Sequence, residues 1–189
     1  MAKKITKVII VPVRLRTTKY LTKILFICHG NICRSPMAEF IMKHLVARAG
    51  RADEFEIASA AVSTEEIGND IYPPAKRMLA AKNVPFSHRA ARQMTRADYA
   101  YYDYIVCMDQ SNLRWLQYII GDDSDHKVSL MMAWTMTNDP YLQIVPSGKE
   151  SQITNIENVP DVSDPWYTGD FAKAYDDILE GCQAMLKQI

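Results

Sequence analysis

A continuous apolar run of strand length, followed by a short polar loop and a helix, constrains this fold more than any other feature. The run is Ile24-Leu25-Phe26-Ile27, and consecutive apolar residues are typical of a strand that is buried on both faces. The polar loop extends from Cys28 to Ser35, where Ser35 is a plausible helix cap and Pro36 the first helical position. The helix is indicated by apolar residues at helical spacing, Met37, Ile41 and Leu45. This segment therefore predicts a strand, a tight loop and a helix.

The same alternation continues along the chain. Strands are predicted over 55–61, 104–108 and 127–130, and helices over 74–82, around Leu113 to Ile120 behind a cap at Asp109 or Ser111, and over 171–185. Strands that alternate with helices predict an α/β fold in which a parallel sheet is covered by helices on both faces. The stretch 135–162 is the exception, because it is polar and rich in Asn, Pro and Ser. We expect a long loop insertion there, and loops of such length are usually functional or poorly ordered.

Length, charge and cysteine usage exclude several classes of protein. The 189 residues suit one domain, and a formal net charge of zero argues against a generally basic nucleic-acid binder. The charge is uneven, because six basic and no acidic residues fall within positions 1–20. We therefore expect a basic N-terminal extension over 1–21 and one domain over 22–189. Four cysteines are too few for a disulfide scaffold, and the longest apolar run, 8–13, is too short to cross a membrane. These features predict a cytoplasmic protein without nucleic-acid or membrane partners.

The loop between the first strand and helix has the form C-x5-R-S, which suits an anion-binding site. Backbone N–H groups of its central residues, His29, Gly30, Asn31, Ile32 and Cys33, would point inward, and the following helix adds the positive end of its dipole. Gly30 permits a close turn, and Arg34 supplies a planar fork for two phosphate oxygens. Cys28 would lie at the floor of this cradle. The donors that bind an oxyanion would also stabilise its thiolate for in-line attack on phosphorus.

Two other interpretations of these residues are less well supported. C-x5-R alone is a weak pattern, and a cysteine at a strand end is more often a small buried apolar residue. Metal binding is poorly supported, because Cys28 and Cys33 have no accompanying cluster of His and Cys. The strand, loop and helix context together with Gly30 favours an anion-binding nucleophile.

A second polar element, Asp164-Pro165-Trp166-Tyr167, precedes the last predicted helix. A phosphomonoester with a phenolic leaving group needs a proton on the departing oxygen, and Asp164 could deliver it. Trp166 and Tyr167 could form the walls of a slot for an aromatic ring. Alone, Asp-Pro with aromatic neighbours is more often a turn, so the interpretation depends on the C-x5-R-S loop.

Several segments in the same order resemble a known family. They are Ile27-Cys28-His29-Gly30-Asn31-Ile32-Cys33-Arg34-Ser35-Pro36-Met37-Ala38-Glu39, Ser59-Ala60-Ala61, His88-Arg89-Ala90-Ala91-Arg92-Gln93, Met108-Asp109-Gln110-Ser111-Asn112-Leu113 and Asp164-Pro165-Trp166-Tyr167. Together they resemble the low-molecular-weight protein tyrosine phosphatases over about residues 22–130 and 160–188. The resemblance implies a four-stranded parallel sheet of flavodoxin-like order 2-1-3-4, with helices on both faces and the phosphate-binding loop after the first strand.

The resemblance also implies a role for each matching residue. Cys28 would form a phosphocysteine, Arg34 would bind the phosphoryl oxygens, and Ser35 would ease the departure of Cys28. Asp164 would protonate the leaving tyrosine and then activate water. Asn31 would hold the loop in a strained shape through a network with Ser59 and His88. No metal or organic cofactor is implied.

Two further expectations concern the loop cysteine and the mouth of the site. Members of the family can form a reversible disulfide between the two loop cysteines, which makes Cys33 a candidate redox partner of Cys28. Glu65 and Glu66 stand where relatives often carry an aromatic residue or Asn, so we expect carboxylates beside the substrate slot. Cys107 and Cys182 are predicted to be core residues.

The implied function is hydrolysis of phosphotyrosine, and three alternatives remain. A protein arginine phosphatase of the same fold typically has Thr where Ile32 stands, and an arsenate reductase needs two further cysteines close together on a mobile segment. A catalytically silent phosphotyrosine-binding module would not need Cys28, Arg34 and Asp164 intact. The implied partners are phosphotyrosine proteins, which could include a tyrosine autokinase, and inorganic phosphate as product and inhibitor.

Overall fold

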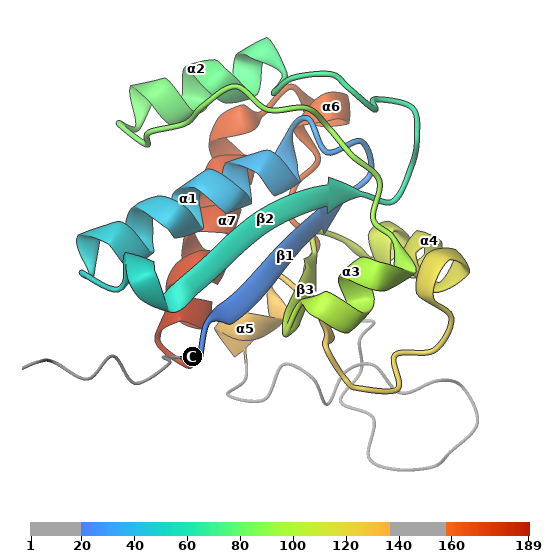
Figure 1. Cartoon of the computed structure of the whole chain (residues 1–189). Helices are drawn as coiled ribbons and strands as arrows, with labels where there is room; N and C mark the ends of the chain where they lie inside the picture. The colour runs from blue at the N-terminus through green and yellow to red at the C-terminus, as the bar shows by residue number, and fades with distance from the viewer. Residues whose placement is uncertain (1–19, 137–157) are drawn as a thin grey trace, which may run out of the picture.

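A four-stranded parallel sheet forms the centre of the molecule, as described by a computed structural model over residues 20–136 and 158–189 (Figure 1). The strands are β1 (Thr22–Cys28), β2 (Phe55–Ala61), β3 (Tyr104–Cys107) and β4 (Val128–Leu130), in the order β2-β1-β3-β4. All three pairings are parallel. The predicted strand order is therefore confirmed, and the carboxyl ends of the strands meet at one edge.

Helices cover both faces of this sheet. They are α1 (Arg34–Arg48), α2 (Pro73–Ala81), α3 (Arg96–Tyr101), α4 (Gln110–Ile120), α5 (Ala133–Met136), α6 (Pro165–Thr168) and α7 (Phe171–Leu186), with a 3-10 turn at Ala52–Glu54. α1 packs against α2 and α7, whereas α3 and α4 pack together on the side of β3 (Figure 1).

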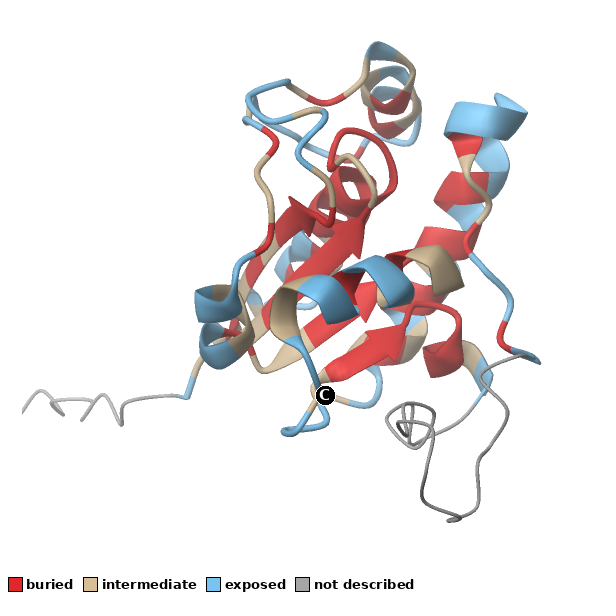
Figure 2. Ribbon diagram, turned by 90° about the vertical axis from the view of Figure 1, so that its right-hand side faces the viewer, coloured by how far each residue is buried: buried red, intermediate tan, exposed pale blue. Residues whose placement is uncertain are grey.

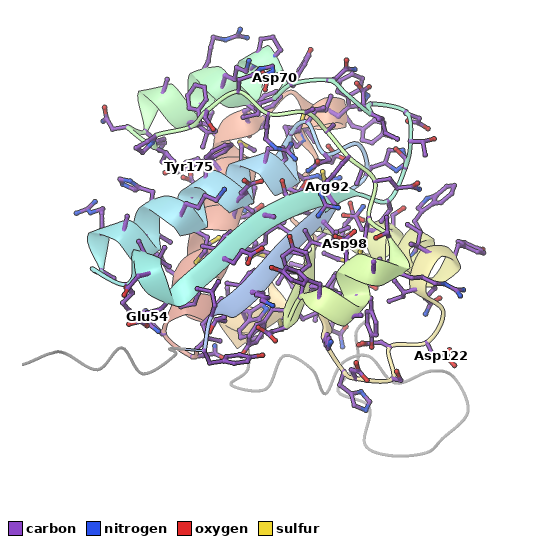
Figure 3. The ribbon with its side chains drawn as sticks, in the orientation of Figure 1. Glu54, Asp70, Arg92, Asp98, Asp122 and Tyr175 are labelled. Carbon is purple, nitrogen blue, oxygen red and sulfur yellow. The ribbon has the colours of Figure 1, made fainter. Side chains whose placement is uncertain are left out.

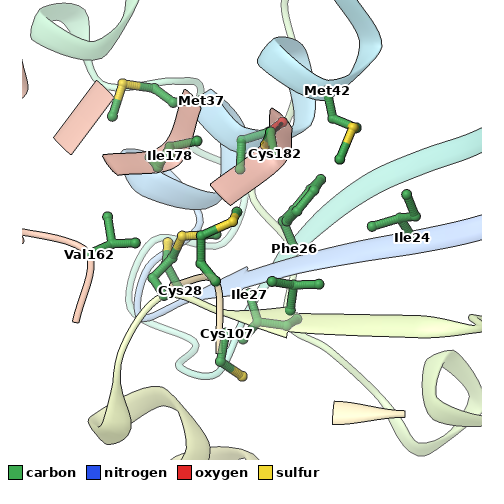
Figure 4. Packing of buried hydrophobic residues seen from close by; sticks show 14 of the residues in the cluster. Ile24, Phe26, Ile27, Cys28, Met37, Met42, Cys107, Val162, Ile178 and Cys182 are labelled. Atoms are coloured by element: carbon green, nitrogen blue, oxygen red, sulfur yellow. Dashed lines mark hydrogen bonds between the residues drawn. The ribbon is translucent and has the colours of Figure 1, made fainter. Parts of the chain in front are cut away.

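The core lies on β1, which is buried from Ile24 to Cys28 (Figure 2). Figure 4 shows the apolar side chains that surround it, among them Cys107 and Cys182, both of which are completely buried. Their predicted core role is confirmed. Burial raises the pKa of both thiols above the ordinary value, so neither is available as a thiolate.

Two helix boundaries differ from the predictions in a way that affects a loop, whereas α2 and α7 are shifted by one residue. α1 begins at Arg34 with Cys33 at the N-cap, so the predicted cap at Ser35 is wrong. The Ser35 hydroxyl lies instead 3.1 Å from Cys28 Sγ, and Pro36 is tolerated because residues of a first turn need no intrahelical N–H partner.

α5 extends to Met136, two residues into the predicted loop 135–162. The predicted extension 1–21, apart from its last two residues, and most of that loop lie outside the described residues.

The short helix α3 was not predicted, although a local signal for it exists. Thr95 accepts a hydrogen bond from the Asp98 N–H and the Asp98 carboxylate accepts one from the Thr95 N–H, which is a capping box with Asp at its third position. Arg92 also donates to both oxygens of Asp98, at 2.9 and 3.0 Å (Figure 3). At the next helix, Asp109 is the cap of α4, as one of the two predicted alternatives had it.

Candidate active site

A pocket at the carboxyl end of β1 brings together residues from three separate segments. It is lined by Cys28, His29, Gly30, Ile32, Cys33 and Arg34 of the loop, by Glu65 and Glu66 after β2, and by Asp164, Trp166 and Tyr167 before α7. The last segment is more than 120 residues from the loop along the chain. The C-x5-R-S loop and the Asp164 segment, which the sequence analysis paired, therefore line the same pocket.

Cys28 lies at the floor of this pocket, with only 3% of its surface exposed. Its Sγ accepts a hydrogen bond from the Asn31 backbone N–H at 3.3 Å and lies 3.1 Å from Ser35 Oγ. Both groups can donate a hydrogen bond to the sulfur. The geometry therefore suits a sulfur nucleophile at the floor of the pocket.

Arg34 is buried beside two carboxylates. It donates to Asp109 Oδ2 at 2.6 Å and to Asp164 Oδ2 at 2.5 Å, and a third bond reaches the Val162 carbonyl at 3.3 Å. Burial alone lowers the pKa of Arg34, but the charges of Cys28, Asp109 and Asp164 outweigh it and raise that pKa overall. The guanidinium is thus held permanently charged in one orientation.

Asp109 is a functional candidate that sequence reasoning considered only as a helix cap. One of its oxygens accepts from the Asn112 N–H and caps α4, while the other holds Arg34. Its position directly after β3 was the available signal, because the carboxyl ends of parallel strands meet at one edge of a sheet. We infer that Asp109 orients the arginine fork.

Asn31 adopts a left-handed backbone conformation, with φ of 58°, at the turn of the loop. Its side-chain amide donates to Ser35 Oγ at 2.8 Å and to Ser59 Oγ at 2.9 Å. Ser59 in turn donates to the buried carboxylate of Glu39 at 2.6 Å. The structure therefore places Asn31 and Ser59 in one network, as the resemblance implied.

The predicted third member of this network, His88, is replaced by its neighbour Arg89. Arg89 donates to the carbonyl oxygen of Asn31 at 2.8 Å and to its side-chain oxygen at 2.6 Å, and Glu39 lies 3.7 Å away. His88 is 83% exposed and lies 2.8 Å from Asp70. The role that the resemblance implied for His88 is therefore wrong, because in this irregular segment the side chain of Arg89 points toward Asn31 and that of His88 points toward Asp70.

The segment with Asp164 is held by contacts that the sequence did not reveal. The Ser163 N–H donates to Asp177, a buried carboxylate on α7, at 3.2 Å, and the Val162 N–H donates to the Met108 carbonyl at 2.9 Å. Asp164 itself caps α6 by accepting from the Trp166 N–H at 3.0 Å. These bonds fix the carboxylate of Asp164 at the edge of the pocket.

Aromatic and acidic side chains border the mouth. Trp166 packs on Tyr72 with ring centroids 5.4 Å apart, and Tyr167 is 85% exposed. His29 Nε2 lies 3.2 Å from Glu65 Oε2. A Cβ atom at Gly30 would come 3.0 Å from Cγ of Glu66, a tight contact that the Glu66 side chain would have to relieve by a small shift.

Clusters of metal ligands and membrane-spanning helices are both absent from the described residues. Within residues 20–136 and 158–189, no grouping of three or more His, Cys, Asp or Glu side chains could hold a metal ion. No helix in the same ranges has the length and apolar character needed to cross a bilayer.

Comparisons with known proteins relate this chain to one family. The profile of the "Low molecular weight phosphotyrosine protein phosphatase" family matches residues 23–159. A curated relative of that name from Rattus norvegicus is 34% identical over 167 residues, which cover 87% of this chain and 94% of the relative. The crystal structure of YfkJ from Bacillus subtilis aligns with a TM-score of 0.74 at 30% identity and covers 89% of this chain and 94% of that one. A Drosophila arginine phosphatase, DARP, aligns with a TM-score of 0.69 at 26% identity and covers 88% of this chain and 96% of that one. The chain therefore belongs to the low molecular weight phosphotyrosine protein phosphatase family.

Proposed function

We propose that this protein is a phosphatase that hydrolyses phosphotyrosine through a phosphocysteine on Cys28. The observation that carries the proposal is the arrangement of three groups around one pocket. Cys28 lies at the floor, the charged fork of Arg34 is beside it, and Asp164 faces the space from the opposite segment. A nucleophile, an anchor for the phosphoryl oxygens and a proton donor are the groups that the reaction needs.

The reaction proceeds in two displacements at phosphorus. In the first, the Cys28 thiolate forms a P–S bond as the bond to the tyrosyl oxygen breaks, and Asp164 transfers its proton to that oxygen. In the second, Asp164 accepts a proton from water, the water oxygen bonds to phosphorus, and the P–S bond breaks to give inorganic phosphate. Ser35 Oγ donates to the departing thiolate, and Arg34 holds the equatorial oxygens in both steps.

The choice of an aromatic leaving group is supported by the mouth of the pocket. Trp166 and Tyr167 can flank a phenyl ring, and phosphoserine is too short to bring its phosphate to the buried sulfur past such walls. A panel of peptides that carry phosphotyrosine, phosphoserine or phosphoarginine tests this directly. We expect turnover of phosphotyrosine, and preferred turnover of another residue would contradict the proposed substrate.

Phosphoarginine is the second candidate, because the Drosophila arginine phosphatase shares the fold. Ile32 lines the pocket at the position where Thr was expected for that activity, which favours phosphotyrosine. An arsenate reductase is not supported, because Cys107 and Cys182 are buried and their pKa values are raised. A silent binding module is not supported either, because Cys28, Arg34 and Asp164 are all present.

The mechanism also suggests where and with what the protein works. A thiolate nucleophile must stay reduced, which favours the cytoplasm. We propose phosphotyrosine proteins as substrates, a tyrosine autokinase as one of them, and inorganic phosphate as product and competitive inhibitor.

We expect mild peroxide to inactivate the enzyme reversibly. The Cys28 thiolate would attack peroxide to give a sulfenic acid and hydroxide, and the Cys33 thiol would then form a disulfide with release of water. Burial raises the pKa of Cys33 to about 12, with a further contribution from the charge of Cys28, which oxidation to the neutral sulfenic acid removes. Activity recovered after treatment with a thiol reductant is the measurement. In Cys33→Ser the loss should be irreversible, and unchanged recovery would point to another resolving thiol.

We also expect Glu65 and Glu66 to favour substrates with basic flanks. Each exposed charge pair at about 4 Å contributes only ~1 kcal/mol in water, so the effect is modest. Changing both residues to Gln should narrow the ratio of kcat/KM for basic over acidic phosphopeptides, with a smaller effect on an aryl phosphate. The preference should weaken as added salt shortens the Debye length below ~10 Å. An unaltered peptide preference would show that these carboxylates are only solvated surface groups.

A further inference from the structure

An exposed aromatic surface on α4 adjoins the mouth of the pocket. Trp115 and Tyr118 project from this helix with 48% and 84% of their surfaces exposed, and their ring centroids lie 6.2 Å apart. We call this pair the α4 ridge. Trp115 also meets the imidazole of His29 edge to face, with centroids 6.1 Å apart and an angle of 74° between the planes. Because His29 lines the pocket, the α4 ridge continues the wall of the candidate active site.

The charge at the Trp115 end of this ridge is negative. The other side of His29 contacts Glu65, whose side chain is 70% exposed, and Glu66 follows it in the pocket lining. Arg114 lies four residues before Tyr118 and shares a helix face with it, so a positive charge lies beside the Tyr118 end of the ridge. At the Trp115 end, an indole and a carboxylate flank the same imidazole.

This combination suits a basic side chain. The face of an aromatic ring attracts an ammonium or guanidinium group, most strongly for Trp, and an adjacent carboxylate pairs with the same charge. Trp and Tyr are also the residues most often found at the energetic centres of protein interfaces. Isolated exposed aromatic residues need no explanation, but two in contact at the rim of a pocket form a recognition surface.

We infer that the Trp115 end of the α4 ridge binds a lysine or arginine that flanks phosphotyrosine in the substrate polypeptide. The inference rests on the proposed function and adds the chemistry of the flanking sequence to it. An extended peptide advances about 3.3 Å per residue, so a side chain two or three positions from the phosphotyrosine comes within reach of Trp115. Tyr118, farther from the pocket, would contact a residue one or two positions beyond.

The test measures charge recognition separately from apolar contact. Phosphotyrosine peptides would carry a lysine at one flanking position in an alanine background, and matched peptides would carry acetyl-lysine there, which removes the charge and keeps the stem. The readout is the ratio of kcat/KM for lysine over acetyl-lysine. One flanking position should give the largest ratio. At that position we expect Trp115→Leu, which keeps apolar volume without a ring, to lower the ratio about 2–5-fold. Trp115→Phe, which keeps an aromatic ring, should retain part of that ratio.

A matched control and the remaining outcomes make the result decisive. Phe86→Leu removes another exposed aromatic ring, one outside the pocket lining, and should leave the lysine ratio as it is. An unchanged ratio in Trp115→Leu, with p-nitrophenyl phosphate still hydrolysed, overturns this inference and leaves the proposed function standing. Absence of p-nitrophenyl phosphate hydrolysis in the unaltered protein overturns both. A ridge that instead joins two copies of the chain would change the sedimentation of Trp115→Leu without changing the ratio, which also overturns the inference.

Discussion

Cys28→Ser is expected to abolish turnover while the protein still binds inorganic phosphate. The serine hydroxyl remains protonated in a site built to stabilise a thiolate, so the nucleophile is lost, at a cost on the order of 10⁴-fold or more. The Asn31 N–H and the charged fork of Arg34 remain, and these are the groups that we propose hold the phosphate. Hydrolysis of an aryl phosphate and calorimetric titration with phosphate measure the two properties separately.

Arg34→Lys provides the complementary variant. Its ammonium keeps the positive charge but cannot reproduce the bidentate fork, and it cannot satisfy both Asp109 and Asp164 as the guanidinium does. We expect both turnover and phosphate binding to fall. A thermal unfolding measurement on each variant distinguishes loss of the site from loss of the fold. Appreciable turnover by Cys28→Ser would refute the covalent mechanism.

Asp164→Asn is expected to lower the rate on poor leaving groups by about 10²–10⁴, which is the usual contribution of a positioned acid. The amide can still accept from the Trp166 N–H and cap α6, so the segment should keep its place. It cannot deliver a proton to the departing oxygen. The loss should therefore shrink across a series of aryl phosphates as the pKa of the leaving phenol falls, because weakly basic phenolates depart without a proton.

Asp161→Asn is the matched control for this prediction. Asp161 lies three residues earlier, is exposed outside the pocket lining, and accepts from the Gln110 N–H at 2.9 Å, which an amide oxygen can also do. The rate of Asp161→Asn should depend on the pKa of the leaving phenol in the same way as the rate of the unaltered protein. If Asp164→Asn showed the same deficit across the whole series, Asp164 would not be the acid.

The fold and the centre of the site could be predicted because both depend on short stretches of sequence. The buried run Ile24 to Ile27 can satisfy its backbone only as an interior strand, and the loop that follows has to turn directly into α1. In C-x5-R-S the cysteine and arginine belong to one short loop between a strand and a helix, so the pattern and its local context together indicate an anion site. The capping box of α3 also involves residues that are close in sequence, so Thr95 and Asp98 could have predicted the start of that helix.

Other features depend on contacts between residues far apart in the sequence, and only the tertiary structure decided them. Asp177 holds the Ser163 N–H from a neighbouring helix, and Trp115 meets His29 from a helix more than 80 residues away. Arg89 rather than His88 holds Asn31, because the irregular segment turns that side chain toward the buried charge of Glu39. Propensity and periodicity indicate the type of a segment and which of its faces each side chain occupies. They do not specify which side chain of another segment will be opposite, since that depends on how the whole core packs.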